Sequence, residues 1–230
     1  MYGLKNSEVL AHHIMTMAGG FFGVYALLNR SLTFGSSETS NLIYLFVAGL
    51  TGDGKEFLIR IIAFSIYVGG MMFATIMSRI AKDGDIRYLS AVIDIICCVI
   101  LAQIPQEIHE VIALYPMFFT TAVQWLAYTN AGGFSSATIF STNNCRQCFS
   151  ALANYLYDHD KKHLPAAVLF GGSLIFFHIG VIYSWCCMQV WGLSSIYACI
   201  PIAAAGIIAV RYDRKRKERT GTSVYIKKTA

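Results

Sequence analysis

Two short runs of hydroxyl and amide side chains carry the most distinctive chemistry in this sequence. The first lies in FGSSETSNLIYLF (residues 34–46) and the second in IFSTNNCRQCFSAL (residues 139–152), each directly before a short apolar stretch. Ser, Thr and Asn commonly cap helix N-termini, where four backbone N–H groups lack intrahelical partners. Because the helix dipole adds about half a positive charge at that end, two such termini brought together would favour a small anionic or neutral polar solute.

The candidate solute-binding residues are the polar side chains of these runs and one glutamine in a later apolar stretch: Ser36, Glu38, Thr39, Ser40, Asn41, Gln124, Ser141, Thr142, Asn143, Asn144 and Arg146. For Gln124, lining a cavity and hydrogen-bonding to a neighbouring helix are equally good interpretations. The hydroxyls also have a second interpretation, because small polar residues cap and pack membrane helices without binding a solute. Glu38 and Arg146 either neutralise one another, or Arg146 offers a fixed positive charge to an anionic solute.

Two more ionisable side chains lie within apolar stretches, Asp94 in AVIDIICCVI and His178 in IFFHIGVIY. A charged group at the centre of a membrane helix costs at least about 2.5 kcal/mol on insertion scales, so such residues need partners or a function. Proton coupling is one role open to both. The structural alternatives are a partner for Arg146 or a hydrogen-bonded residue for Asp94, and a satisfied core histidine for His178.

The stretch CRQC, Cys145 to Cys148, is a CxxC motif at a helix start, where the dipole activates thiols. A membrane thiol oxidoreductase would need a second cysteine pair as an electron relay, but Cys186 and Cys187 end a different apolar stretch at the opposite membrane face. No histidine has ligand spacing from CRQC, and no phosphate-binding glycine loop, HExxH or GxSxG motif is present. We therefore expect no enzyme activity, no metal and no cofactor.

The elements that position these residues are expected to be membrane helices. Of 230 residues, 56% are hydrophobic and 13% charged, with a mean hydropathy of +0.54, whereas soluble domains carry about 25% charged residues. A crossing needs roughly 17 to 25 residues, which makes the second and sixth of the eight apolar stretches too short. The stretches lie at about residues 9–28, 42–51, 57–80, 88–104, 111–130, 145–157, 164–187 and 190–210.

The charges of the loops favour six full crossings plus two re-entrant half-helices. If all eight stretches crossed, the loop 79–87 would lie outside, although short cytoplasmic loops collect Lys and Arg. Two stretches can instead enter and return to the same side, provided that protein or a wet cavity surrounds them. This loop, the loop with Lys161 and Lys162, and both termini are then cytoplasmic, and the loop 105–110, which carries no Lys or Arg, is outside.

The two halves of this arrangement have opposite orientations. Aligning Thr39 with Thr142 superposes them and places Gly70 near Gly180. We expect a single transmembrane domain over residues 1–210, made of two inverted repeats at about 9–104 and 111–210, and then a basic cytoplasmic tail at 211–230. The net charge of +5 is concentrated in that tail, which predicts contact with anionic lipid and not with nucleic acid.

The polar runs resemble the motifs of the YoaK family, bacterial multi-spanning membrane proteins of unknown function. Phe34, Thr39, Ser40 and Asn41 match the first motif, and Thr142, Asn143, Asn144 and Arg146 match the second. The motif glycines are replaced by Ser40 and Asn143, and the Asp that this family tends to carry in its first span corresponds to Phe22 or Gly23. The resemblance extends over nearly the whole chain and implies a divergent member with a multi-spanning fold, without indicating a substrate.

Inverted repeats with broken helices bind solutes near the membrane midplane in many transporters. We therefore expect an all-α integral protein of the bacterial cytoplasmic membrane that acts as a transporter or channel for a small anionic or neutral polar solute. Its expected partners are the lipid bilayer and the solute, with homodimerisation as a further way to bury surface. The first alternative is a non-transporting scaffold or accessory subunit, which would lack a wet cavity at Thr39 and Thr142. The second is the CxxC thiol oxidoreductase.

Overall fold

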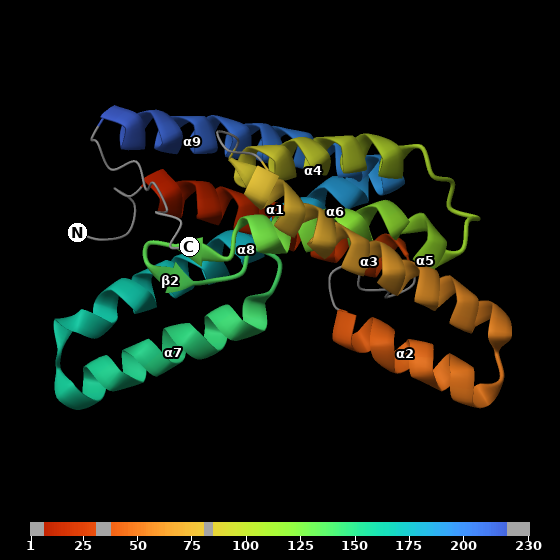
Figure 1. Cartoon of the computed structure of the whole chain (residues 1–230), viewed down its shortest axis with the longest axis horizontal. Helices are drawn as coiled ribbons and strands as arrows, with labels where there is room; N and C mark the ends of the chain where they lie inside the picture. Colours follow the sequence, from red (N-terminus) through yellow and green to blue (C-terminus); the bar gives the residue numbers. More distant parts are fainter. Residues whose placement is uncertain (1–6, 31–37, 81–84, 220–230) are drawn as a thin grey trace.

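The computed structural model describes residues 7–30, 38–80 and 85–219, which are helical almost throughout (Figure 1). The expected all-helical class is therefore confirmed. The elements, in chain order, are α1 (Ser7–Asn29), α2 (Glu38–Thr51), α3 (Gly54–Ile80), α4 (Ile86–Ala102), α5 (Glu110–Ala113), α6 (Tyr115–Ala127), β1 (Asn130–Ala131), β2 (Phe134–Ser135), α7 (Ser141–Asp158), the 3-10 helix η1 (Lys161–His163), α8 (Leu164–Trp191), the 3-10 helix η2 (Gly192–Cys199) and α9 (Ile200–Arg219).

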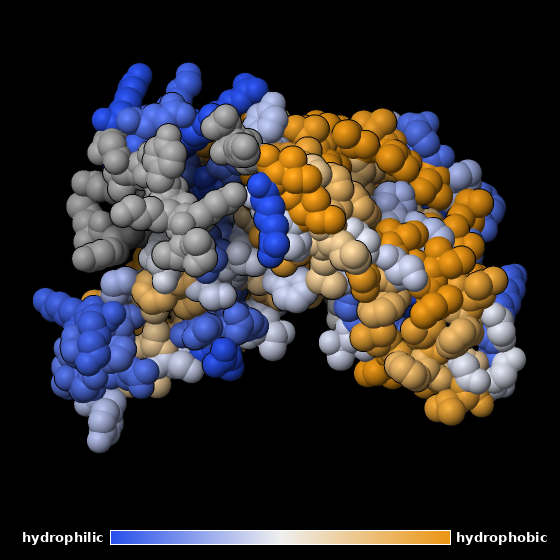
Figure 2. All heavy atoms as spheres, in the orientation of Figure 1, coloured by the Kyte–Doolittle hydropathy of each residue, from blue (hydrophilic) through white to orange (hydrophobic). Residues whose placement is uncertain are grey.

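Three helical stretches of the described residues are long and apolar enough to cross a membrane: Ser7–Asn29, Gly54–Ile80 and Lys161–Arg219. Many large hydrophobic side chains also point outward, among them Leu50 at 87% and Phe46 at 68% exposed. Figure 2 shows hydrophobic surface spread continuously over α2, α3 and α4. Apolar patches of this extent are typical of surfaces that contact a membrane or another protein.

The helix contacts form two similar sets. Helix α1 packs against α8 and α9, and helix α6 packs against α3 and α4. Helices α4 and α9 contact one another. The shorter helices complete two hairpins, because α2 packs against α3 and α7 packs against α8. Figure 1 shows these hairpins projecting from the remaining helices toward opposite ends of the long axis of the molecule.

Glycines set the spacing of the central helix pairs. A Cβ added at Gly180 of α8 would lie 2.0 Å from the carbonyl oxygen of Met17, and one at Gly20 of α1 would lie 2.1 Å from that of Phe177. In the other half, a Cβ at Gly70 of α3 would lie 2.7 Å from the carbonyl oxygen of Phe119. Such close backbone contact is the small-residue packing that membrane helix pairs use.

Both short helices are longer than the apolar stretches predicted for them. The stretches 42–51 and 145–157 become α2 (Glu38–Thr51) and α7 (Ser141–Asp158), because the polar runs themselves form the first helical turns. Helix α7 ends at Asp158, and the left-handed backbone of the C-cap residue His159 (φ 57°) terminates it. Polar residues therefore extend each helix toward its N-terminus without lengthening its apolar part.

The predicted crossing 111–130 is divided into α5 and α6. The division lies at Leu114, two residues before Pro116, which has no backbone N–H to continue the helical ladder. After α6 the chain forms a small antiparallel hairpin, β1–β2, which the sequence reasoning did not predict. Gly132 and Gly133 close its turn with φ angles of 56° and 86°. Helix α9 continues through residues 211–219 of the predicted tail, and residues 220–230 lie outside the described part of the chain.

Candidate functional site

The first turns of α2 and α7 form the candidate site. Figure 1 shows the two helices running apart, with their N-terminal ends facing each other between the hairpins. The surface is hollowed at this place (Figure 2). Thr39 in the first turn of α2 and Thr142 in the first turn of α7 are exposed. Residues of the predicted polar runs thus form the first turn of both helices, and each first turn has an exposed threonine.

In α2, the side chains of Glu38 and Asn41 contact one another. Asn41 is 7% exposed and donates a hydrogen bond from Nδ2 to Glu38 Oε1 at 3.4 Å. Glu38 and Ser40 are half-buried. Ser36, which was also predicted to contact a solute, lies outside the described residues. The amide of Asn41 and part of the Glu38 carboxyl are therefore buried, whereas Thr39 of the same turn is exposed.

In α7, Asn144 holds the preceding segment of chain. Its side chain is 1% exposed, and Nδ2 donates to the carbonyl oxygens of Ala137 at 2.7 Å and Phe140 at 3.2 Å. Its Oδ1 accepts a hydrogen bond from Ser136 Oγ at 3.0 Å. With these bonds, Asn144 fixes the extended segment 136–140 against the helix start. Its geometry is that of a structural residue, which differs from the solute contact expected for it.

Arg146 lies on the exposed side of α7 and donates a hydrogen bond from Nη2 to Asn143 Oδ1 at 3.1 Å. Ser141 and Asn143 are half-buried. The suggested ion pair between Glu38 and Arg146 is not formed, and Glu38 instead accepts a hydrogen bond from Asn41 on its own helix. The two side chains belong to separate hairpins, and Glu38 Oε2 is buried without a hydrogen-bond partner among the described residues. The guanidinium of Arg146 is exposed close to the helix N-terminus.

Gln124 is fully buried in α6. Its Nε2 donates to the carbonyl oxygen of Met15 at 2.8 Å and to Thr138 Oγ1 at 3.1 Å. The side chain therefore joins α6, α1 and the segment that leads into α7. The helix-bonding interpretation of Gln124 fits these contacts, although its Oε1 atom has no hydrogen-bond partner among the described residues.

Two histidines that sequence reasoning left without a role are part of the same polar centre. The hydroxyl of Ser136 donates its proton to Asn144, so the 2.9 Å contact with His12 requires His12 Nε2–H to donate to Ser136 Oγ. His13 donates from Nε2 to the carbonyl oxygen of Leu169 at 3.1 Å. Both side chains are buried, at 1% and 2% exposed. Two adjacent histidines in an apolar stretch were the signal available in the sequence.

The two residues considered for proton coupling have different surroundings. Asp94 of α4 is fully buried, and neither carboxyl oxygen has a hydrogen-bond partner among the described residues. Ser90, one turn earlier in α4, is buried with an unpaired hydroxyl as well. His178 is on an exposed face of α8 and donates from Nδ1 to the carbonyl oxygen of Leu174 at 2.7 Å. Asp94 is thus the buried ionisable group that lacks a structural explanation.

Cys148 of α7 lies beside one end of α8, and Cys186 and Cys187 lie near the other end of that helix. Cys148 is buried and lies 3.6 Å from the carbonyl oxygen of Ala167, near the start of α8. Cys186 and Cys187 follow about 20 residues later in the same helix, roughly 30 Å at 1.5 Å per residue. This separation is too long for direct thiol exchange between the pairs. In the described part of the chain, no group of three His, Cys, Asp or Glu side chains has metal-site geometry.

A family model described as "Protein of unknown function (DUF1275)" matches residues 11–210. The chain belongs to the DUF1275 family. The match begins in α1 and ends in α9, so the part shared with DUF1275 includes both hairpins and both polar runs but excludes the basic end of α9. This agrees with the expected membership of a family of unknown function over nearly the whole chain. No curated protein and no solved structure matches the chain.

Proposed function

We propose that this DUF1275 protein moves a small anionic or neutral polar solute across the membrane, through a site at the facing N-termini of α2 and α7. The observation that carries the proposal is the arrangement of these two helix starts. Each has an exposed threonine, α7 begins without a side-chain cap hydrogen bond, and the two ends face each other across a hollow (Figures 1 and 2). Helix N-termini arranged in this way are anion-binding sites, because dipole and N–H groups act together.

The same proposal includes six crossings and two inverted repeats. Helices α1, α2, α3 and α4 of the first half correspond to α6, α7, α8 and α9 of the second. The contact of α1 with α8 then corresponds to that of α6 with α3, and the contact of α1 with α9 to that of α6 with α4. The contact of α2 with α3 likewise corresponds to that of α7 with α8. Gly70 and Gly180, which the sequence alignment of the halves brought close, each lie at the corresponding crossing with α6 or α1. These correspondences support a two-fold relation between the halves.

The membrane normal is proposed to follow the long axis of Figure 1. The start of α1, the end of α9 and the turn between α7 and α8 lie at one end of that axis, and the turn between α2 and α3 lies at the other. Lys161, Lys162 and the basic residues of α9 all belong to the first end. Because cytoplasmic loops collect Lys and Arg, we assign this end to the cytoplasm.

In this arrangement, α2 and α7 enter from opposite sides and start near the midplane. The exposed guanidinium of Arg146 adds a full positive charge to the partial charges of the two helix ends. Glu38 adds a carboxyl group on the opposite side of the hollow, and Asn41 covers part of it. The balance of these groups favours a solute with hydrogen-bond acceptors, such as a small anion or a neutral polar metabolite.

The proposal is tested by a thermal-stability screen of the purified protein against inorganic anions and small metabolites. A ligand that binds only the folded state stabilises it by about 2.7 kcal/mol at a hundred times its Kd. We expect the shift produced by a true ligand to disappear in Thr39→Val and in Arg146→Ala. The matched controls are Thr75→Val and Arg79→Ala, which change exposed residues of α3 and should keep the shift.

A shift that persists in both site variants, or that disappears equally in the controls, would contradict the site. The absence of any stabilising compound would favour the scaffold alternative. Replacing Cys145 and Cys148 with serine should leave ligand shifts unchanged, because neither thiol is needed in this mechanism.

A further inference from the structure

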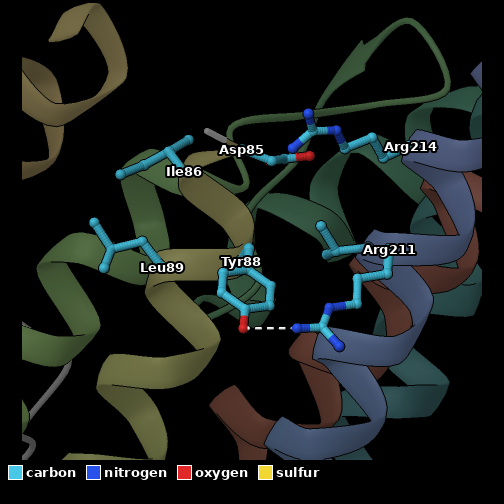
Figure 3. Close-up of a pocket in the computed structure, with 7 residues that line it drawn as sticks. Asp85, Ile86, Tyr88, Leu89, Arg211 and Arg214 are labelled. Carbon is cyan, nitrogen blue, oxygen red and sulfur yellow. Dashed lines mark hydrogen bonds between the residues drawn. The ribbon is translucent and has the colours of Figure 1, made fainter. Parts of the chain in front are cut away.

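The cytoplasmic ends of α4 and α9 enclose a cavity with an unusual lining. Its volume is about 490 Å³, and its walls are Asp85, Ile86, Tyr88, Leu89, Val210, Arg211 and Arg214. Figure 3 shows Arg211 and Arg214 extending from α9 toward the side chains of α4. Three aliphatic side chains and one aromatic ring therefore lie beside two guanidinium groups.

The cavity lies where the hydropathy of α9 changes. Residues 200–210 of this helix are apolar, and residues 211–219, RYDRKRKER, are almost all charged. Val210 is the last residue of the apolar part and Arg211 the first of the charged part, and both line the cavity. In a membrane helix this boundary lies at the level of the lipid headgroups. The apolar wall thus matches the acyl chain of a lipid and the basic wall matches its headgroup, at the depth where chain and headgroup meet.

Arg211 is held in position by Tyr88. Its Nη2 donates to the phenol oxygen at 2.9 Å, and its guanidinium carbon lies 5.0 Å from the centre of the ring (Figure 3). Arg214 is one helical turn further along the same face of α9, and its contact with Glu218 is an exposed ion pair at 3.1 Å. Such pairs contribute little, so the Arg214 guanidinium can turn toward a ligand in the cavity.

Two carboxylates near the cavity, Asp85 and Asp213, are paired with cations other than Arg211 and Arg214. Asp85 accepts bonds from Arg87 Nε at 2.9 Å and 3.1 Å, and Arg87 Nη2 also reaches Asp213 at 2.9 Å. Asp213 is fully buried and has Lys217 as a second cation at 3.1 Å. Among the described residues, Arg211 has no carboxylate partner and Arg214 has only the exposed pair with Glu218, so both guanidinium groups can bind an external anion.

We propose that this cavity binds an anionic phospholipid, with its phosphate between Arg211 and Arg214 and the upper part of an acyl chain against Ile86, Leu89 and Val210. Arginine presents several N–H groups in one plane and binds phosphate oxygens in pairs. Basic pockets between membrane helices on the cytoplasmic side recognise lipid headgroups by the same combination. The bound lipid would join α4 to α9 at the cytoplasmic surface.

The test is native mass spectrometry of the full chain in neutral detergent, titrated with phosphatidylglycerol, phosphatidylcholine or soluble glycerol phosphate. We expect phosphatidylglycerol to bind roughly ten- to thirty-fold more tightly than phosphatidylcholine. The variant Arg211→Ala/Arg214→Ala should lose this preference. The control Lys215→Ala/Arg219→Ala removes the same charge from α9 without changing the cavity lining, and it should keep the preference.

Equal losses in the two double variants would show general attraction to the basic helix and overturn the cavity site. Equal binding of both lipids to the wild-type protein would do the same. Tight binding of glycerol phosphate without a preference for the lipid would mean that the site takes a free phosphate, and would also contradict the proposal. If the double variant does not fold, Arg214→Ala alone gives the same comparison without disturbing Tyr88.

Discussion

The substitution Gly180→Ala tests how tightly α1 and α8 are packed. The new Cβ would lie 2.0 Å from the carbonyl oxygen of Met17 and 2.9 Å from its carbonyl carbon. An ordinary C···O contact is about 3.3 Å or longer, so the helices must separate by more than about 1 Å. Both sides of this contact are backbone, and no side chain can rotate to relieve it. The reciprocal contact of Gly20 with Phe177 would be lost in the same movement.

Overpacking of this kind costs about 1 to 3 kcal/mol, and we expect the upper part of the range because the clash is with backbone. Replacing Gly with Ala in a helix returns about 1 kcal/mol. The net loss in the free energy of unfolding should therefore be about 2 kcal/mol. The assay is reversible unfolding in mixed micelles, followed by circular dichroism.

Gly69→Ala is the matched control, because no atom lies within 4 Å of a Cβ at this position. This variant should be as stable as the wild type or up to about 1 kcal/mol more stable. If Gly180→Ala were as stable as the wild type, the close contact between α1 and α8 would be contradicted. The same would follow if Gly69→Ala were destabilised as much as Gly180→Ala.

Three further substitutions have defined outcomes in thermal unfolding. His159→Gly should stabilise the protein by about 1 kcal/mol, because glycine adopts the left-handed conformation (φ 57°) without strain; a loss of stability would mean that the side chain contributes contacts of its own. Asn144→Ala should destabilise it by roughly 2 to 3 kcal/mol, since buried partners including Ser136 lose their bonds, whereas the exposed Asn154→Ala should change nothing. Asp94→Asn should raise the unfolding midpoint, because a buried carboxylate without a partner is costly; a lower midpoint would reveal a stabilising partner.

The coarse architecture could be predicted because membrane helices are specified by local composition. Long apolar stretches become α1, α3 and α8, as expected from the length needed to cross a hydrocarbon core. The helix starts at Glu38 and Ser141 lie within the predicted polar runs, but Ser141 does not cap α7: the N-cap is Phe140, which makes no side-chain cap hydrogen bond. The length of α7 could not be anticipated in this way, because its polar side chains lower the hydropathy without preventing a helix.

The roles of single polar residues could not be predicted, since they depend on which helices meet. Asn144 was expected at a helix start in contact with a solute, but the chain before α7 turns back and takes up its hydrogen bonds. His12 had no evident partner in sequence, because Ser136 is 124 positions away. The pairing of Glu38 with Arg146 was plausible by symmetry. It does not form, because Asn41 and Asn143 are nearer.

The central claim is that α2 and α7 face each other through their N-termini, deep in the membrane. Spin labels at Thr39→Cys and Thr142→Cys in a cysteine-free protein, reconstituted in lipid nanodiscs, report both the distance between the helix starts and their depth. The reference pair carries labels at Leu50→Cys and Tyr157→Cys, near the other ends of the two helices. From the 1.5 Å rise per residue of each helix, we predict that the first pair is up to about 40 Å closer together than the reference pair. Both labels of the first pair should be shielded from a water-soluble relaxation agent that is too large to enter the hollow. A first-pair distance equal to or longer than the second, or labels at the level of the headgroups, would contradict the account.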